Sequence, residues 1–399
     1  MHRVSSLIGC QKSVWVALLP FLMASVTSLR AQNAGAPRAS HPPQAFFFPW
    51  LLHSPQVHAN DKVTFRFRDP NAHKVVLLLE GAKPAPMKKG DHGIWSVTVG
   101  PLQPEYYGYS FLADGVSLMD PSNPLIKPNL LNPQSMVYVP GPSTLPWQMN
   151  NVPHGVVHHQ FFHSDVVGDN RDFYVYTPPG YNPRGRKRYP VLYLLHGFSD
   201  GADAWTDVGR ANIILDNLIA QGKAKPMIVV MPLGYGAPQI LKPGKLGNMA
   251  LAKENLTKFS QSLLTEVMPR VEKDYRVLTG RANTAIAGLS MGGGESLFVG
   301  LNHLNRFAWV GAFSAGLLPD LNQEFPRLSA KDNARLRLLW IACGEQDTLV
   351  GPFNVKLRAW LRKKGVDFTK IETPGVHSWM VWRGNLAAFA PLLFRKHSR

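Results

Sequence analysis

The chain is poor in cysteine, with only Cys10 and Cys343 among its 399 residues. Cys10 lies in the first 31 residues, whose pattern (below) is that of a cleaved export signal. Removal of that segment would leave Cys343 alone and would exclude an intrachain disulfide. Stability then has to come from core burial, which a chain of this length can supply.

Long apolar runs are also missing. The longest, Val14 to Val26, is broken by a proline and a serine and is shorter than the ~20 residues that a membrane span needs. Arg3 and Lys12 come before its core and small residues follow it, which predicts a signal peptide cleaved after Ala31. We therefore expect a secreted or periplasmic protein with no stable membrane insertion.

Acidic residues are scarce: 26 Asp and Glu stand against 43 Lys and Arg, for a formal net charge of +17. The signal carries three of the cations and no acid, so its removal lowers the charge to +14. The basic residues are scattered, without a stripe of interleaved aromatics, so no nucleic-acid partner is expected. We interpret the charge as a solvated basic surface; the alternative is attraction to anionic polymers of a cell envelope or plant cell wall.

Sets of metal ligands are lacking too. Four histidines, His154, His158, His159 and His163, are close together on a strand-like segment. No cysteine or acidic partner stands near them at zinc-finger spacing. We expect no metal site and no cofactor.

Two structural patterns follow the signal. Residues 32–53 form an Ala/Pro/His-rich linker, and residues 54–143 hold short alternating segments typical of a small β-sandwich. From 150 to 399, apolar runs alternate with segments of helical spacing, which predicts a mostly parallel sheet covered by helices on both faces. The expected strands are 191–195, 227–231, 284–287, 309–313 and 336–343, and the expected helices are 211–221, 255–275, 293–304 and 352–364.

The segment Gly288-Leu289-Ser290-Met291-Gly292 follows an expected strand and precedes an expected helix. A Gly-x-Ser-x-Gly run in this context predicts a nucleophile elbow, a turn too tight for side chains at its two glycines. The turn would expose the Ser290 hydroxyl and aim helix N–H groups at a developing oxyanion. Ser290 is therefore the candidate nucleophile of a serine hydrolase.

A serine hydroxyl needs a base to act as a nucleophile. In hydrolases with a nucleophile elbow the order along the chain is serine, acid, histidine, and this order selects the base. His377 lies in a loop after a last expected strand near Ile371, whereas His303 falls inside a helical segment. An acid should follow the penultimate strand; Asp347 is our choice and Glu345 the alternative.

The loop after the third strand, residues 196–201, should supply the second oxyanion donor. We expect the backbone N–H groups of Phe198 and Met291 to form this hole, and His196 to hold the loop. Trp205, Trp379 and Trp382 are candidates for an aromatic acyl pocket.

Several stretches resemble carbohydrate esterase family 1, the feruloyl and acetylxylan esterases, and the related enterochelin esterases: residues 189–197, 214–219, 225–232, 287–293 and 377–383. The resemblance covers about 150–399. It implies an α/β-hydrolase fold, with Ser290, Asp347 and His377 at the positions of the triad. It also implies an acylated polysaccharide or oligosaccharide as substrate, with feruloyl or acetyl groups on xylan.

Residues 54–143 resemble the early-set, immunoglobulin-like domains that precede such esterases, through segments such as 93–95, 109–111 and 120–124. Trp95 and Tyr109 could stack on sugars, but alternating aromatics usually face a core. Two other functions stay open: an enterochelin-type siderophore esterase, against which the export signal argues, and a non-catalytic glycan-binding protein. The oligomeric state is left undetermined.

Overall fold

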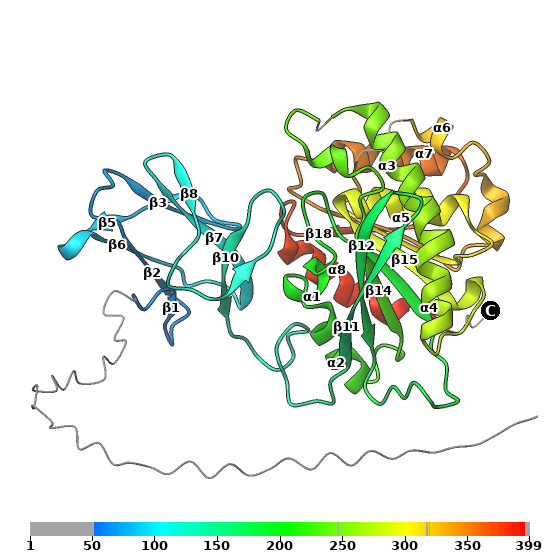
Figure 1. Cartoon of the computed structure of the whole chain (residues 1–399), viewed down its shortest axis with the longest axis horizontal. Helices are drawn as coiled ribbons and strands as arrows, with labels where there is room; N and C mark the ends of the chain where they lie inside the picture. The colour runs from blue at the N-terminus through cyan, green and yellow to red at the C-terminus, as the bar shows by residue number, and fades with distance from the viewer. Residues whose placement is uncertain (1–51, 246, 317, 319, 396–399) are drawn as a thin grey trace, which may run out of the picture. The chain divides into compact units, whose positions relative to one another are not determined.

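The computed structural model of the chain describes residues 52–245, 247–316, 318 and 320–395 (Figure 1). The predicted signal peptide, 1–31, and all but the last two residues of the predicted linker lie outside the described residues. Within the described ranges, no helix has the length and apolar character needed to cross a membrane.

The N-terminal part consists of two antiparallel sheets. The first has the order β1-β2-β6-β5, and the second has the order β4-β3-β7-β10-β9, with β8 paired to β7. The strands are β1 (Gln56–Val57), β2 (Val63–Arg68), β3 (Val75–Leu79), β4 (Ala85–Pro86), β5 (Lys88–Lys89), β6 (Ile94–Val99), β7 (Glu105–Ala113), β8 (Val116–Leu118), β9 (Ile126–Lys127) and β10 (Gln134–Val139).

Alternating side chains from both sheets form one core, in which Phe65, Tyr109 and Phe111 are fully buried. Trp95 is also buried, and its indole N–H donates to the Asp69 carbonyl. Trp95 and Tyr109 are thus core residues and offer no face to a sugar. The immunoglobulin-like character of this sandwich remains a prediction.

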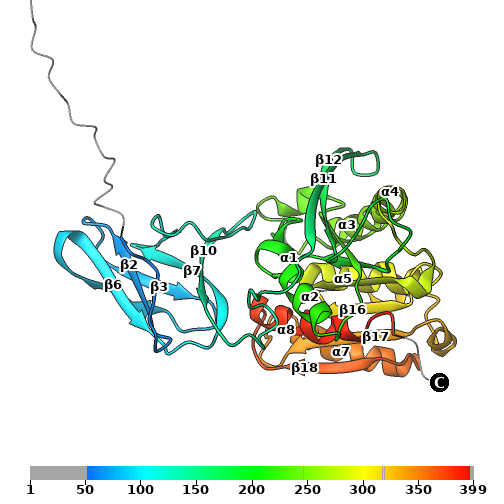
Figure 2. The same cartoon turned by 90° about the horizontal axis from the view of Figure 1, so that it is seen from below.

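The C-terminal part is built on an eight-stranded sheet with the order β11-β12-β14-β13-β15-β16-β17-β18. Figure 2 shows this order from the β11–β12 hairpin at one edge to β18 at the other. All neighbours from β14 to β18 pair in parallel. The strands are β11 (Val156–Ser164), β12 (Asp169–Thr177), β13 (Val191–Leu195), β14 (Ile228–Pro232), β15 (Thr284–Leu289), β16 (Trp309–Phe313), β17 (Leu338–Gly344) and β18 (Thr369–Thr373).

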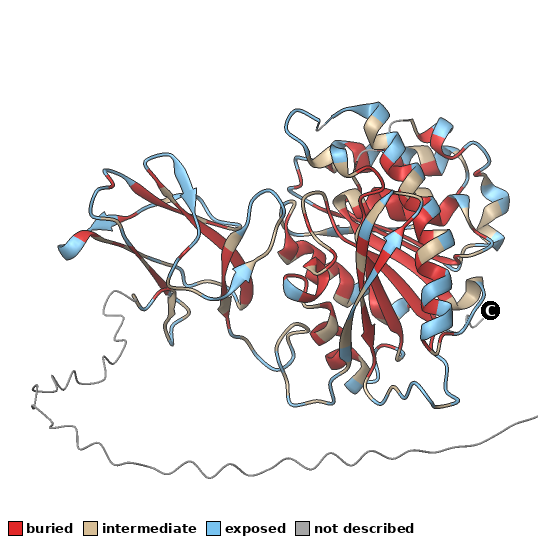
Figure 3. Ribbon diagram, viewed as in Figure 1, coloured by how far each residue is buried: buried red, intermediate tan, exposed pale blue. Residues whose placement is uncertain are grey.

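Helices cover both faces of this sheet. In β13, side chains 191, 193 and 195 pack in one core with residues of α3, α4, α5 and α7, while 192 and 194 pack in the other with residues of α1, α2 and α8. Burial on both faces explains why the central strands are continuously apolar (Figure 3). The helices are α1 (Ala204–Asp207), α2 (Ala211–Ala220), α3 (Met249–Ser262), α4 (Met268–Asp274), α5 (Ser290–Asn302), α6 (Leu321–Glu324), α7 (Gly351–Lys363) and α8 (Trp379–Phe389).

The expected α/β-hydrolase architecture is confirmed, with differences in detail. The single helix expected over 255–275 begins earlier, at Met249, and is interrupted by a π-helical turn at Leu263–Val267. The strand-like segment that carries His158, His159 and His163 is β11, whereas its partner β12 and the helix α8 were not among the expected elements. Helix α8 begins two residues after His377 and bears on the site described next.

Candidate active site

Ser290 stands between β15 and α5, at the carboxyl end of a central strand. Its φ of 50° is left-handed, an uncommon conformation that costs energy in a non-glycine residue. A Cβ at Gly288 would lie 2.5 Å from the Gly292 carbonyl oxygen, and a Cβ at Gly292 would lie 2.4 Å from the His196 carbonyl oxygen. These approaches explain both glycines and fix the serine at the tip of the turn.

The structure brings together the three residues that sequence order selected. His377 Nε2 lies 3.0 Å from Ser290 Oγ, and His377 Nδ1 lies 2.8 Å from Asp347 Oδ2. The side chain of His377 is 17% exposed and that of Asp347 is fully buried, so the chain of hydrogen bonds leads from the surface into the protein. The His377 ring also packs edge to face with Trp382, with 4.8 Å between the ring centroids.

Asp347 lies in the loop between β17 and α7. Its Oδ1 accepts hydrogen bonds from the backbone N–H groups of Leu349 and Val350, which leaves Oδ2 for His377. Burial raises the pKa of Asp347, but the hydrogen bonds from His377 and Val350 outweigh it and hold the net pKa below its usual value. The alternative acid, Glu345, is exposed on the same loop.

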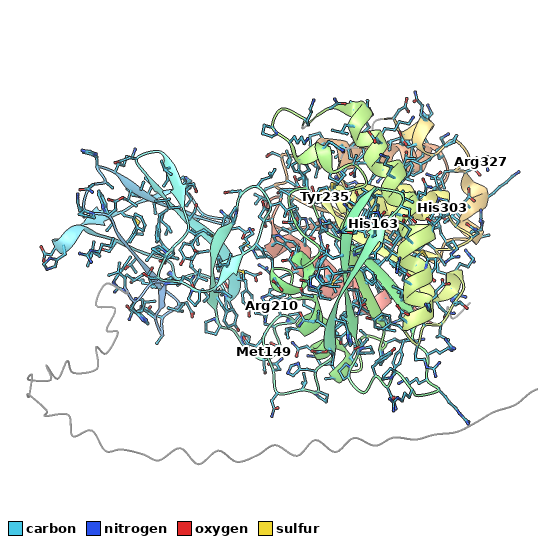
Figure 4. The ribbon with its side chains drawn as sticks, in the orientation of Figure 1. Met149, His163, Arg210, Tyr235, His303 and Arg327 are labelled. Atoms are coloured by element: carbon cyan, nitrogen blue, oxygen red, sulfur yellow. The ribbon has the colours of Figure 1, made fainter. Side chains whose placement is uncertain are left out.

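The loop after β13 is anchored by two buried side chains. The His196 ring bonds the Gly197 carbonyl through Nδ1, and its Nε2 accepts from the Gly234 N–H, which requires the neutral ring. Burial lowers the pKa of His196 to about 4, consistent with that state. Tyr235, labelled in Figure 4, donates its hydroxyl to the Asp200 carbonyl. His196 thus holds the loop that carries Phe198, as predicted.

A cavity of about 310 Å³ opens over Ser290. The hydrolase part contributes the apolar residues Phe198, Leu289, Leu349, Trp379 and Trp382. It also contributes the polar residues Ser199, Asp200, Ser290, His377 and Ser378. The N-terminal sandwich contributes a polar set: Glu80, Lys127, Asn129, Asn132 and Gln134. We call this set from the sandwich the front wall.

Two of the three predicted pocket tryptophans, Trp379 and Trp382, line this cavity from α8. Trp205 is placed differently from the prediction and is not a lining residue. It is fully buried, its indole N–H donates to the Leu195 carbonyl, and its ring packs edge to face with Trp379, with 5.1 Å between the centroids. Trp205 therefore supports the pocket wall from behind.

The front wall was not anticipated from the sequence. Lys127 Nζ lies 3.1 Å from Glu80 Oε2, and both side chains are 13% exposed. Asn129 Nδ2 donates to Ser199 Oγ and to Asp200 Oδ1. No periodicity or motif marks these residues, because their role depends on packing against segments far along the chain.

Other histidines considered in the sequence lie away from Ser290. His303 follows the last residue of α5, roughly 20 Å along the helix axis from Ser290 at 1.5 Å per residue; Figure 4 labels it. In the β11 group, His154 contacts Asp216, His159 contacts Asp172 and His163 contacts Asn170. These contacts are pairwise, and the described residues hold no group of three ligands suited to a metal ion.

Comparison with known proteins assigns the chain to a family. A sequence relative, "Endo-1,4-beta-xylanase/feruloyl esterase" of Xylanibacter ruminicola, is 30% identical over 353 residues, which cover 86% of this chain and 46% of the relative. The chain thus spans less than half the length of that protein. An "Acetyl esterase" of Caldicellulosiruptor saccharolyticus is 22% identical over 49% of this chain and 80% of its own.

Among solved structures, a CE1 ferulic acid esterase of Anaeromyces mucronatus is 28% identical with a TM-score of 0.54, over 64% of this chain and 96% of its own. The enterobactin esterase of Shigella flexneri has a TM-score of 0.62 over 86% of this chain and 97% of its own, and at 19% identity shows the fold alone. The sequence model of the family described as "Putative esterase" matches residues 164–393, more than half of the chain. The chain therefore belongs to the putative esterase family.

Proposed function

We propose that this esterase is an exported serine hydrolase that cleaves acyl esters of plant polysaccharide, with feruloyl or acetyl groups on xylan. The observation that carries the proposal is the continuous hydrogen-bonded chain from Ser290 through His377 to Asp347, at the base of a cavity with aromatic walls. The feruloyl esterase relatives support the choice of substrate class, and the pattern of residues 1–31 supports export.

In the first half of the reaction, Ser290 Oγ attacks the ester carbonyl carbon while its proton passes to His377 Nε2. Asp347 stabilises the imidazolium through Nδ1, and the backbone N–H groups of Phe198 and Met291 bind the oxyanion. The C–O bond to the alcohol then breaks, and the leaving oxygen takes the proton from His377. The products are a free alcohol and an acyl group on Ser290.

The second half regenerates the enzyme. Water enters the space left by the alcohol and gives a proton to His377 Nε2 as its oxygen attacks the acyl carbon. Collapse of this second tetrahedral intermediate returns the proton to Ser290 Oγ and releases the carboxylic acid. His377 alternates between base and acid, and no cofactor takes part in these steps.

The lining of the cavity favours an aromatic acyl group. Trp379 and Trp382 meet edge to face at 5.5 Å, and Trp382 also packs on His377, so the apolar wall reaches the reacting atoms. A planar phenylpropenoyl group buries more area against such a wall than an acetyl group does. We therefore place ferulate ahead of acetate.

Charge argues against an anionic ferric catecholate. Lys127 is the single lysine or arginine among the described residues that line the cavity, and Glu80 pairs with it. Asp200 adds a further carboxyl, whose pKa burial raises to about 7. A highly charged anion loses its hydration when it enters the cavity, and this wall has no unpaired cation to offset that cost.

A substrate panel tests the proposal. Methyl ferulate, p-nitrophenyl acetate and ferric enterobactin are compared by kcat/KM for the full chain and for Ser290→Ala. We expect the order ferulate, acetate, enterobactin, with every activity lost in the variant. Preference for enterobactin, or full turnover by Ser290→Ala, would contradict the proposal.

A further inference from the structure

The strongest unassigned feature is the front wall, which carries polar side chains of the sandwich into the cavity above Ser290. The sandwich and the hydrolase part belong to one compact unit, residues 50–399, and the front wall lies within it. Its residues belong to β9, to the start of β10 and to the segments that flank β9 and follow β3. None of them takes part in the chemistry proposed above.

Direct bonds hold this wall against the catalytic loops. Asn129 bridges to Ser199 and Asp200, and the Leu130 N–H donates to the Ser199 carbonyl at 2.7 Å. Glu80 accepts from the Gly108 N–H through Oε2 at 2.9 Å and from the Trp379 N–H through Oε1 at 3.4 Å. Contacts on both sides of the cavity fix the wall before any ligand arrives, which lowers the entropic cost of binding.

A missing side chain makes room for the wall. A Cβ at Gly108, on β7, would lie 2.8 Å from Lys127 Cδ and 3.0 Å from Gln134 Oε1. Both side chains therefore lie directly over the bare backbone of Gly108. The arrangement presents the ammonium and the amide side by side at the cavity.

The wall is polar but carries little net charge. Burial raises the pKa of Glu80, but Lys127, Arg383 and the Gly108 N–H outweigh it and hold the net pKa below its usual value, so the carboxylate and the ammonium neutralise each other. Asn129, Asn132 and Gln134 add neutral amides. Fixed, uncharged donors and acceptors match a neutral molecule that carries several hydroxyl groups.

An ester at Ser290 has two arms, and the cavity has two kinds of lining. The aromatic residues of α8 suit the acyl arm, which leaves the polar residues for the alcohol. We infer that the front wall is a subsite for the sugar alcohol of the ester, in which Lys127, Asn132 and Gln134 bind hydroxyl groups of a neutral sugar. This inference rests on the proposed function and makes the sandwich part of the specificity of the enzyme.

The test compares two esters with the same acyl group: methyl ferulate and the feruloyl ester of arabinose. The double variant Asn132→Ala/Gln134→Ala leaves the Lys127–Glu80 pair in place, because neither residue belongs to it. Loss of two hydrogen bonds to neutral hydroxyls should lower the ratio of kcat/KM, sugar ester over methyl ester, about tenfold. Lys127→Gln should lower the same ratio.

Lys74→Gln is the matched control, because Lys74 is exposed on the same sandwich and does not line the cavity; its ratio should equal that of the wild type. An unchanged ratio in the double variant, or an equal loss on both esters, would overturn the sugar subsite while the proposed function stands. Wild-type activity on neither ester would contradict the feruloyl esterase activity proposed above, and the subsite with it.

Discussion

At the residue scale, Asp347 has a different partner for each of its carboxylate oxygens. Backbone N–H groups occupy Oδ1 and the His377 ring occupies Oδ2, so the carboxylate fixes both the orientation and the tautomer of the ring. Ser290 and His377 could be selected from the sequence, because a strand–turn–helix and a chain order are local signals. The choice between Asp347 and Glu345 could not be settled there, because burial separates them and burial depends on the whole fold.

Asp347→Asn should keep the fold and lose activity. The amide would present N–H groups or a weak acceptor to Nδ1 and favour the wrong tautomer of His377, so we expect kcat to fall by about 10³–10⁴. Turnover of methyl ferulate at neutral pH measures it, with circular dichroism as a check on folding. Glu345→Gln, on the same loop, is the control and should keep wild-type turnover; a kcat for Asp347→Asn within twofold of the wild type would refute the role.

From the pKa of His196 in the folded protein we predict how the free energy of unfolding depends on pH. Its pKa falls from an ordinary value near 6.5 to about 4 in the fold, because burial disfavours the charged ring. Between these pH values the unfolded chain binds a proton at this ring and the folded chain does not. The contribution of His196 to the free energy of unfolding is therefore fully present above pH 6.5 and is lost as the pH falls toward 4. The loss attributable to this one residue is about 3 kcal/mol.

His196→Asn isolates that contribution, because an amide can still donate one hydrogen bond and accept another. Urea unfolding at several pH values should show the variant less stable than the wild type near pH 7, with the gap narrowing toward pH 4. Carboxylates that titrate in the same range are common to both proteins and cancel in the difference. A gap that stays constant with pH would show that the His196 ring is not held neutral.

At the element scale, α8 joins the two halves of the cavity. It begins at Trp379, two residues after His377, and its Met380 packs on the core of the sandwich. Fully buried Arg383 donates to the carbonyls of Val208 and Tyr106, and its Nε lies 3.0 Å from Glu105 Oε1. A helix that is apolar nearly all round shows no clear face in its sequence, which explains why the helical pattern of this segment was missed.

Arg383→Met should be strongly destabilising. It leaves the buried Glu105 carboxyl and two backbone carbonyls without their partner, which costs about 3–5 kcal/mol in the free energy of unfolding. Burial already raises the pKa of Glu105 to about 7 despite the arginine, so part of the cost should be relieved at acid pH as the carboxyl binds a proton.

Arg327→Met, at an exposed arginine labelled in Figure 4, is the control and should change stability by less than about 0.5 kcal/mol. Urea unfolding of both variants measures the difference. Equal stability of Arg383→Met and Arg327→Met would show that the buried arginine contributes nothing to the joint between α8 and the sandwich.

At the scale of the whole molecule, the sequence predicted the order of the elements better than their contacts. Continuous apolar strands separated by helices indicated the sheet, and Ser290, Asp347 and His377 follow β15, β17 and β18, in the order expected for the fold. The front wall could not be predicted because its contacts join distant parts of the chain: Glu80 bonds the Trp379 N–H, 299 residues away. The domain boundaries at 54–143 and 150–399, like the signal peptide at 1–31, remain proposals made from the sequence.

The central claim is that Ser290 forms a covalent acyl-enzyme. Its most direct test is stoichiometric labelling with an activated organophosphate, followed by intact mass measurement and peptide mapping of the full chain. We predict one adduct per chain, on the peptide that contains Ser290, with loss of esterase activity in proportion to labelling and no adduct in Ser290→Ala. An adduct at another residue, or full activity after complete labelling of Ser290, would contradict the account.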